Sequence, residues 1–385
     1  MKALSSPALR LAIAGAVSQG AAVGIGRFVF TPILPVMMAG LHLSSGQAGW
    51  IASANFAGYL VGALVATAPA FARKPRFWLL LALAISAVTT AGMGLTTALL
   101  VFLILRAIGG VASAFVLVFA STVVLQRLAQ LGRGELSAVH FAGVGSAIVI
   151  SALATSAVAM AGYGWSLMWL VSGALSFAAL LAVLALLPPD DPGAGKASAP
   201  LPDEPIRKGL PTLLLAYGLF GFGYVVTATF IVAIVKTYPA AHPVQPFVWL
   251  LVGAAAVPSV MLWTFIGGRI GVRRAFAVAC VVEALGVAVS VLRPTADGAV
   301  IASLLLGGTY MGITALGLVA ARALEPHNPS RALGRMTAAF GLGQMIGPAF
   351  AGWLAERLGG FGLASLIASG ALLVSAALTF RREVR

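Results

Sequence analysis

The sequence predicts an all-α integral membrane protein with twelve transmembrane helices, arranged as two pseudo-repeated six-helix bundles. Hydrophobic residues make up 60% of the 385 residues and charged residues only 9%, whereas a soluble domain carries about 25% charged residues. Short segments rich in glycine and other small residues recur roughly 198 residues apart, which is typical of a duplicated transporter fold. Lysine and arginine also gather on one side of the apolar stretches, which predicts an orientation in the membrane.

The repeat depends on four pairs of short segments that share a near-constant offset. The pairs are Gly24–Arg27 with Gly221–Tyr224, Gly109-Gly110 with Gly307-Gly308, Gly143–Gly145 with Gly341–Gly343, and Ser172–Leu175 with Ser369–Leu372. Between the two copies, residues 188–210 are rich in proline, glycine, serine and charge, a composition typical of a linker. We therefore expect one bundle over 1–187, a cytoplasmic linker over 188–210, and a second bundle over 211–385.

Twelve apolar stretches are long enough to cross a bilayer as helices, which takes about 20 residues. Helices are the expected form because every backbone polar group must be satisfied within the membrane. The predicted spans are 10–38, 46–72, 76–95, 98–126, 137–160, 165–187, 211–237, 245–268, 275–292, 298–322, 333–357 and 361–380.

The basic residues predict which side of the membrane faces inward. Lys236, Arg293 and Arg357 fall on one side of this map, and Arg27 and Arg106 lie within spans, while all the other lysines and arginines fall on the side of the N-terminus. By the positive-inside rule, this distribution predicts that both termini are cytoplasmic. We expect a multi-pass protein of the bacterial cytoplasmic (inner) membrane.

Several function classes are disfavoured by the sequence. The net charge of +14 forms no basic stripe, so we expect no nucleic-acid partner. A single cysteine, Cys280, excludes a metal site made of cysteines. The Gly143–Gly145 and Gly341–Gly343 segments follow no strand and precede no Walker lysine, so we expect no cofactor, no metal and no enzymatic activity.

Motifs along the whole chain resemble the major facilitator superfamily, and in particular its YbfB/YjiJ-like branch. They are Gly24–Phe28 with Thr31-Pro32 in span 1, Gly221–Tyr224 with Thr227–Phe230 in span 7, Gly307–Gly317 in span 10, and Thr337–Gln344 with Gly347-Pro348 in span 11. The resemblance implies that spans 1, 4, 7 and 10 line a central cavity and that two bundles rock in alternating access. Arg106 with Gly109-Gly110 matches the arginine-then-glycine pattern that the superfamily carries in span 4.

Two superfamily patterns are incomplete here. The loop after span 2 carries Arg73-Lys74-Pro75-Arg76 without the aspartate that is usual there, and Gly268 occupies the corresponding position in the second half. A gating salt bridge on that aspartate is therefore in doubt. Ile150 stands in span 5 where a proline would mark a drug/proton antiporter, which weakens the drug-export interpretation.

Arg27 and Arg106 are the strongest candidates for a substrate site. Charges at membrane depth are costly and usually face a cavity or a partner, and no Asp or Glu lies in any predicted span of the first half. A guanidinium binds a carboxylate through two parallel hydrogen bonds, so the pair favours an anionic solute. The alternative is that one or both arginines bind helix-end carbonyls and only hold helices together.

The remaining candidates are polar side chains within the predicted spans. Glu283 and His140 are the candidates for proton coupling, with a structural glutamate and an interfacial histidine as the favoured alternatives. Further candidates for binding substrate are Asn55, Thr227, Tyr224, Tyr310, Thr314 and Gln344. Each could instead make an interhelical hydrogen bond, which is common in membrane bundles.

The sequence thus predicts a secondary active transporter of a small organic solute, expected to be anionic, that works by rocking alternating access. Proton coupling follows from the resemblance rather than from residues. The alternatives are an exporter of amphipathic drugs and a non-transporting membrane receptor or scaffold. The expected partners are the small-molecule substrate and the lipid bilayer, with no obligate protein partner.

Overall fold

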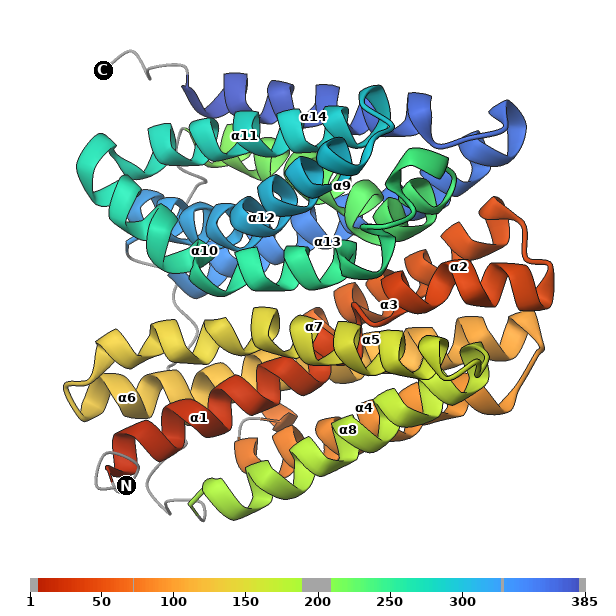
Figure 1. The fold of residues 1–385 in the computed structure, drawn as a ribbon. Coiled ribbons are helices and arrows are strands. Elements are labelled where there is room, and N and C mark those ends of the chain that lie inside the picture. The colour runs from red at the N-terminus through yellow and green to blue at the C-terminus, as the bar shows by residue number, and fades with distance from the viewer. Residues whose placement is uncertain (1–5, 72, 189–208, 327–328, 381–385) are drawn as a thin grey trace.

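The computed structural model describes residues 6–71, 73–188, 209–326 and 329–380, so nearly all of the predicted linker lies outside the described residues. Helix α1 (Pro7–Gln19) begins, and α14 (Gly362–Phe380) ends, at the same end of the bundle (Figure 1). We call this the terminal end. The opposite end, where α2 (Phe30–Leu41) stops and α3 (Ser45–Val65) starts, is called the distal end.

The first half of the chain, residues 6–188, forms six spans. Span 1 consists of α1, a π-helical segment (Gly20–Ile25) and α2, and span 2 is α3. Span 4 consists of α5 (Leu99–Ala120), a second π-helical segment (Ser121–Leu125) and α6 (Gln126–Gln130). The other spans of this half are α4 (Pro75–Gly92), α7 (Ser137–Met160) and α8 (Trp165–Leu186).

The second half, residues 209–380, forms six long helices. They are α9 (Leu210–Lys236), α10 (Val248–Ile270), α11 (Val272–Leu292), α12 (Ala296–Leu324), α13 (Pro329–Leu358) and α14. By length and apolar composition, eleven segments of the described chain can cross a membrane, and α13 completes the twelve. The described residues contain no strand, so the predicted fold class is confirmed.

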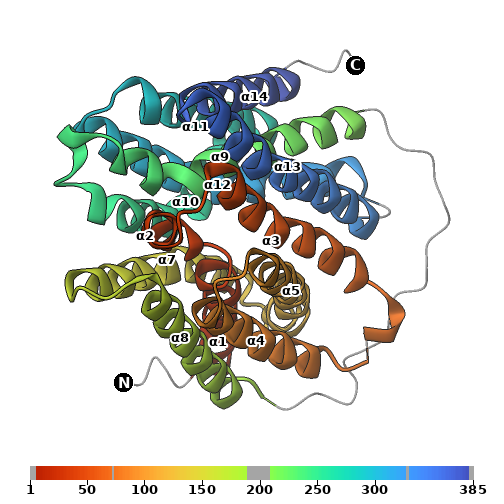
Figure 2. The same cartoon turned by 90° about the vertical axis from the view of Figure 1, so that its right-hand side faces the viewer.

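The two halves lie in two layers, with α9–α14 in the upper layer of Figure 1 and the first half below it. Helices α2 and α3 reach the boundary between the layers, where they lie close to the second half (Figure 2). Across this boundary α3 packs against α13, α7 packs against α10, and α2 packs against α9.

Span 1 is interrupted near its middle. The amides of Gly26 and Phe28 bond to carbonyls five residues earlier, at 2.9 and 3.2 Å, and residues 26–29 form turns between the π-helical segment and α2. Pro32 has no N–H and cannot bond to the Phe28 carbonyl. Thr31 bonds to that carbonyl instead, at 3.2 Å, so this turn is tighter than an α-helix.

Small residues bring the backbones of the two halves into close contact. A Cβ on Gly49 in α3 would lie 2.4 Å from the carbonyl oxygen of Pro348 in α13, and a Cβ on Gly352 would lie 2.3 Å from the oxygen of Ser45. On the other side of the molecule, a Cβ on Gly145 in α7 would lie 2.7 Å from the backbone nitrogen of Val257 in α10. Such glycines let membrane helices approach closely.

The distal parts of the two halves are joined by hydrogen bonds. Thr31 donates to the Ala228 carbonyl at 2.7 Å, and Lys236 donates to the Pro35 carbonyl at 3.3 Å. The Glu356 carboxylate accepts from the Gly46 amide at 3.1 Å, at the start of α3. Every residue of α9 from 223 to 235 is buried, whereas Pro211, Thr212 and Leu215 near the terminal end are exposed. The distal end is therefore the closed end.

Candidate substrate site

Arg106 in α5 holds the interrupted part of span 1. Its two terminal nitrogens donate to the carbonyl oxygens of Gly26 and Arg27, at 2.9 and 3.1 Å. The next helix supports this arrangement, because the Asn55 side chain in α3 donates to the Arg106 carbonyl at 2.9 Å. The two bonds that Arg106 donates are charge-assisted, and they go to carbonyls that the interrupted helix leaves without regular partners. Arg106 therefore fixes the shape of span 1 in this conformation.

Arg27 is a buried cation with little to compensate its charge. Its guanidinium carbon lies 4.0 Å from the ring centre of Tyr59 and 5.4 Å from that of Phe56, so aromatic faces cover it. One terminal nitrogen lies 3.4 Å from the Ser113 hydroxyl, and Nε has no partner. Within the described parts of the chain, no carboxylate lies in salt-bridge range of Arg27 or Arg106.

The second half contributes a wall of stacked aromatic rings. The Tyr224 ring lies parallel to Tyr310 and to Phe340, with centres 5.7 Å apart in both cases and interplanar angles of 3° and 4°. Phe28 of the interrupted segment contacts this wall, because its ring lies 6.0 Å from Tyr310 and 6.2 Å from Trp249. Offset and tilted ring pairs of this kind are favourable beyond their burial.

Several of the polar candidates have hydrogen-bonding atoms without a partner. They are Oδ1 of Asn55, the hydroxyls of Thr227 and Tyr310, and Oε1 of Gln344. Gln344 donates its amide to the Tyr224 hydroxyl. Buried polar groups are normally paired, so these atoms, together with Nε of Arg27 and Nε of Arg106, could bind a solute or water. The Thr314 hydroxyl differs, because it bonds back to the Tyr310 carbonyl at 2.8 Å.

The two proton-coupling candidates lie on α11 and α7, which carry none of the rings of this wall. Glu283 in α11 is fully buried, and neither carboxylate oxygen has a hydrogen-bond partner. Of the two forms expected for a structural glutamate, protonated or hydrogen-bonded, this arrangement favours the protonated one. A buried carboxyl group without a partner is expected to be neutral, because ionisation would cost too much.

His140 lies in the first turn of α7 and its side chain is fully buried among helices. Its Nε2 lies 3.3 Å from the Gln19 amide nitrogen, and a Cβ on Gly15 would lie 2.2 Å from its Nδ1. The ring faces α1 because α7 turns this side of its first turn toward that helix, so its position at the membrane interface stays a prediction.

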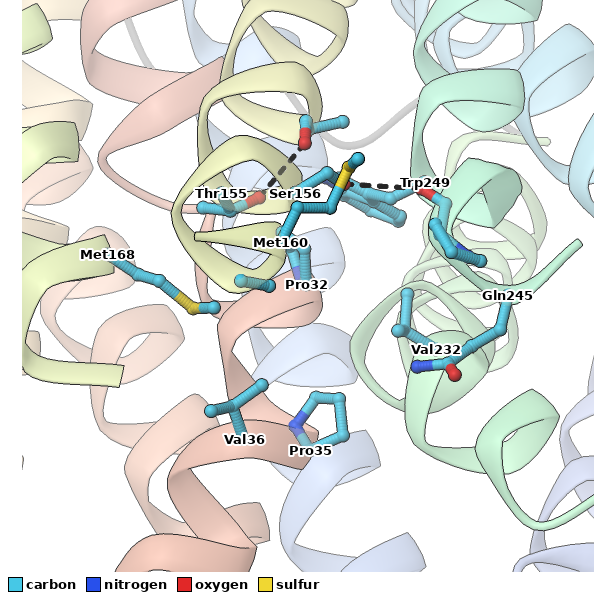
Figure 3. Close-up of a pocket in the computed structure, with 13 residues that line it drawn as sticks. Pro32, Pro35, Val36, Thr155, Ser156, Met160, Met168, Val232, Gln245 and Trp249 are labelled. Carbon is cyan, nitrogen blue, oxygen red and sulfur yellow. Dashed lines mark hydrogen bonds between the residues drawn. The ribbon is translucent and has the colours of Figure 1, made fainter. Parts of the chain in front are cut away.

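A pocket of about 230 Å³ lies between α2, α7, α9 and the start of α10 (Figure 3). Pro32, Pro35 and Val36 of α2 line it opposite Val232 and Trp249, and Thr155, Ser156, Met160 and Gln245 complete much of the wall. All of its lining side chains are uncharged. Trp249 both lines the pocket and contacts Phe28, and the Phe28 ring centre lies 6.0 Å from the Arg27 guanidinium carbon, so this ring pair lies next to both the pocket and Arg27.

The sequence did not identify Tyr59, Phe28 or Ser113 as site residues. Tyr59 could have been proposed, because it is four residues after Asn55 and lies on the same helix face. Phe28 and Ser113 could not, because their contacts depend on how span 1 crosses α5 and α10.

An interrupted first span, two repeated halves and a polar centre between them define a transporter of the major facilitator type. The family of the uncharacterised MFS-type transporter YbfB matches residues 20–380, and the chain belongs to that family. The chain is thus a transporter and not an enzyme. No curated relative matches it.

Solved structures support the same fold. The chain is similar to the nucleoside transporter NupG in its D323A mutant form, with a TM-score of 0.78, 17% identity, and coverage of 98% of this chain and 100% of NupG. A bacterial homologue of the human lysosomal transporter Spinster, inward-facing and occupied, gives a TM-score of 0.74 and 14% identity over 97% of this chain and 95% of the homologue. At such identities the likeness concerns the fold alone.

Proposed function

We propose that the protein is a secondary active transporter of a small organic anion, bound at Arg27 and moved by rocking alternating access. The single observation that carries the proposal is the Arg27 guanidinium. It is 5% exposed, has one long hydrogen bond and has no carboxylate partner among the described residues. A buried charge is costly unless it is paired, and an anionic solute would supply the missing partner.

Arg106 has a different role in this proposal. Because both of its terminal nitrogens bind backbone carbonyls, it positions the segment that carries Arg27 rather than binding the solute itself. Asn55, Thr227, Tyr224, Tyr310 and Gln344 complete the site, with Thr314 at its edge. Arg27 and Asn55 belong to the first half and the others to the second, so closure around the solute would bring the halves together.

The closed distal end supports an inward-facing state if the terminal end is cytoplasmic, as the basic residues predict. The membrane would be a bacterial inner membrane, with the two bundles divided at residues 188–210. Proton coupling is proposed from the superfamily, with Glu283 and His140 as the candidate residues. Glu283 is the weaker candidate, because it lies in α11, outside the interface between the halves. Neither a resident cofactor nor an obligate protein partner is proposed.

The test is uptake by proteoliposomes of labelled benzoate and lactate, tetraphenylphosphonium, and glucose, with and without an imposed pH gradient. We expect uptake of at least one carboxylate in the wild type and its loss in Arg27→Gln. Arg269→Gln is the matched control, because this exposed arginine stacks on Phe265 near the terminal end and should leave uptake unchanged. Uptake of the phosphonium alone, equal in wild type and Arg27→Gln, would instead favour the drug-export alternative.

A further inference from the structure

We propose that the solute is a planar aromatic monocarboxylate, such as a benzoate, whose ring lies against the aromatic wall of the second half. This inference rests on the proposed function, because it assumes that Arg27 binds the anion. It is carried by three features of the site: the number of available charges, the covering of the guanidinium, and the geometry of the stacked rings.

The charges favour a single negative charge on the solute. Arg27 has a partnerless Nε and one long bond at 3.4 Å, whereas the terminal nitrogens of Arg106 are already bonded to carbonyls. One guanidinium binds one carboxylate through two parallel hydrogen bonds. A dicarboxylate or a phosphate dianion would bring a second negative charge. The neighbouring cation, Arg106, has only its Nε without a partner, because both terminal nitrogens bind backbone carbonyls, so it cannot offer that charge two parallel hydrogen bonds without releasing span 1. Such a charge is strongly disfavoured when buried.

The covering of Arg27 determines how a carboxylate could approach. The Tyr59 ring centre lies 4.0 Å from the guanidinium carbon and occupies one face of the guanidinium. The edge of the guanidinium, where the N–H groups point, is still available at Nε. A carboxylate bound at that edge therefore projects the rest of the solute away from Tyr59.

The next group in reach is aromatic. The ring centre of Phe28 lies 6.0 Å from the Arg27 guanidinium carbon and 6.0 Å from the ring centre of Tyr310. Phe28 thus links the cation to the parallel rings of Tyr310, Tyr224 and Phe340. A flat ring attached directly to the carboxylate can pack against these rings with favourable ring–ring geometry, whereas a flexible or saturated chain cannot.

The partnerless atoms of the wall add a preference for polar ring substituents. Oε1 of Gln344 can accept a hydrogen bond, and the hydroxyls of Tyr310 and Thr227 can donate or accept one. A ring hydroxyl or amine would satisfy such an atom. Hydroxylated or aminated benzoates are therefore expected to bind at least as tightly as benzoate.

The experiment measures dissociation constants by thermal shift of the detergent-purified full chain, at constant ionic strength, for benzoate, cyclohexanecarboxylate, benzamide and phthalate. A ligand that binds the folded state raises the melting temperature by mass action. We expect cyclohexanecarboxylate to bind at least about fivefold more weakly than benzoate, which is within the range of an aromatic pair. Benzamide, which lacks the charge, and phthalate, which has two, should give little or no shift.

Substitutions locate the effect on the wall. Tyr310→Leu and Phe340→Leu should reduce the preference for benzoate over cyclohexanecarboxylate to near unity, while Phe177→Leu should not change it, because Phe177 is exposed at 54% on the outside of α8. The ratio of two constants within one variant does not depend on that variant's stability. Having two wall variants keeps the test valid if one of them fails to fold.

The outcomes separate this inference from the proposed function. Equal binding of benzoate and cyclohexanecarboxylate, both lost in Arg27→Gln, would overturn the aromatic preference and leave the anion transporter standing. A benzoate preference that persists in both wall variants would also overturn it, because the ring would then bind elsewhere. Stabilisation by tetraphenylphosphonium and by no carboxylate would overturn both proposals.

Discussion

Gly352→Ala should shift the protein toward a state that is open at the distal end. In the present conformation the added methyl carbon would lie 2.3 Å from the Ser45 carbonyl oxygen and 3.1 Å from the Cα of Gly49. A comfortable C···O contact is about 3.3 Å or more, so the backbones of α3 and α13 must separate by about 1 Å. Overpacking of this kind costs about 1–3 kcal/mol.

The cost applies only when α3 and α13 are in contact. If the halves rock, the distal-open state separates these helices and accepts the methyl group without strain. A difference of about 1–3 kcal/mol then raises the distal-open population relative to the closed state by about 5- to 150-fold. Other contacts of the closed distal end, such as Thr31 with Ala228, would be lost together with this one.

The assay is the rate at which a membrane-impermeant thiol reagent labels Val232→Cys in a Cys280→Ser background. Val232 lines the distal pocket and is 5% exposed, so labelling reports opening of that end. The control is Gly370→Ala. A Cβ on Gly370 meets nothing within 4 Å, and this substitution brings the same gain in helix propensity as Gly352→Ala. An unchanged labelling rate in Gly352→Ala, or the same increase in both variants, would refute the reasoning.

Three side chains around the site give further predictions. Arg106→Gln should lower the melting temperature in detergent, because the Gly26 and Arg27 carbonyls would lose charge-assisted bonds worth about 1.5–3 kcal/mol each, and Arg106→Lys should restore part of the loss. Phe28→Ala should reduce gradient-driven accumulation of benzoate in proteoliposomes while counterflow continues, because we expect the ring pair with Trp249 to form the barrier between the pocket and Arg27. Phe177→Ala is its control. Glu283→Gln should leave both pH-driven accumulation and counterflow nearly intact, because an amide replaces a buried, neutral carboxyl group.

Each of these predictions has a contrary result. An unchanged melting temperature in Arg106→Gln, with anion binding lost, would make Arg106 the direct anchor. Full accumulation in Phe28→Ala would show that another barrier closes the distal end. Loss of pH-driven accumulation in Glu283→Gln, with counterflow preserved, would identify Glu283 as the coupling site.

The arrangement of the helices could be predicted because it depends on local and repeated properties of the chain. Apolar length places the spans, so the predicted span 211–237 agrees closely with α9 (Leu210–Lys236). Pro32 likewise predicts a disturbance in span 1, because proline removes a helical hydrogen bond wherever it lies. Small residues such as those of the segments Gly143–Gly145 and Gly341–Gly343 are typical of close helix contacts, and Gly143 and Gly343 do lie against the backbones of neighbouring helices.

The partners of the site residues could not be predicted in the same way. Arg27 and Arg106 looked equivalent in the sequence, as two buried cations without acids. Only the crossing of α5 over the interrupted span shows that Arg106 binds two carbonyls while Arg27 faces Tyr59. The contact of Glu356 with the start of α3 joins residues far apart in the chain, and no local pattern marks it.

The most direct test of the central claim is calorimetric binding of benzoate, or of whichever carboxylate in the series binds most tightly, to wild type, Arg27→Lys and Arg27→Gln. If Arg27 anchors the anion, Arg27→Gln should lose measurable binding, and Arg27→Lys should retain a weaker form of it because a lysine keeps the charge without the planar fork. Equal dissociation constants in all three proteins would contradict the account.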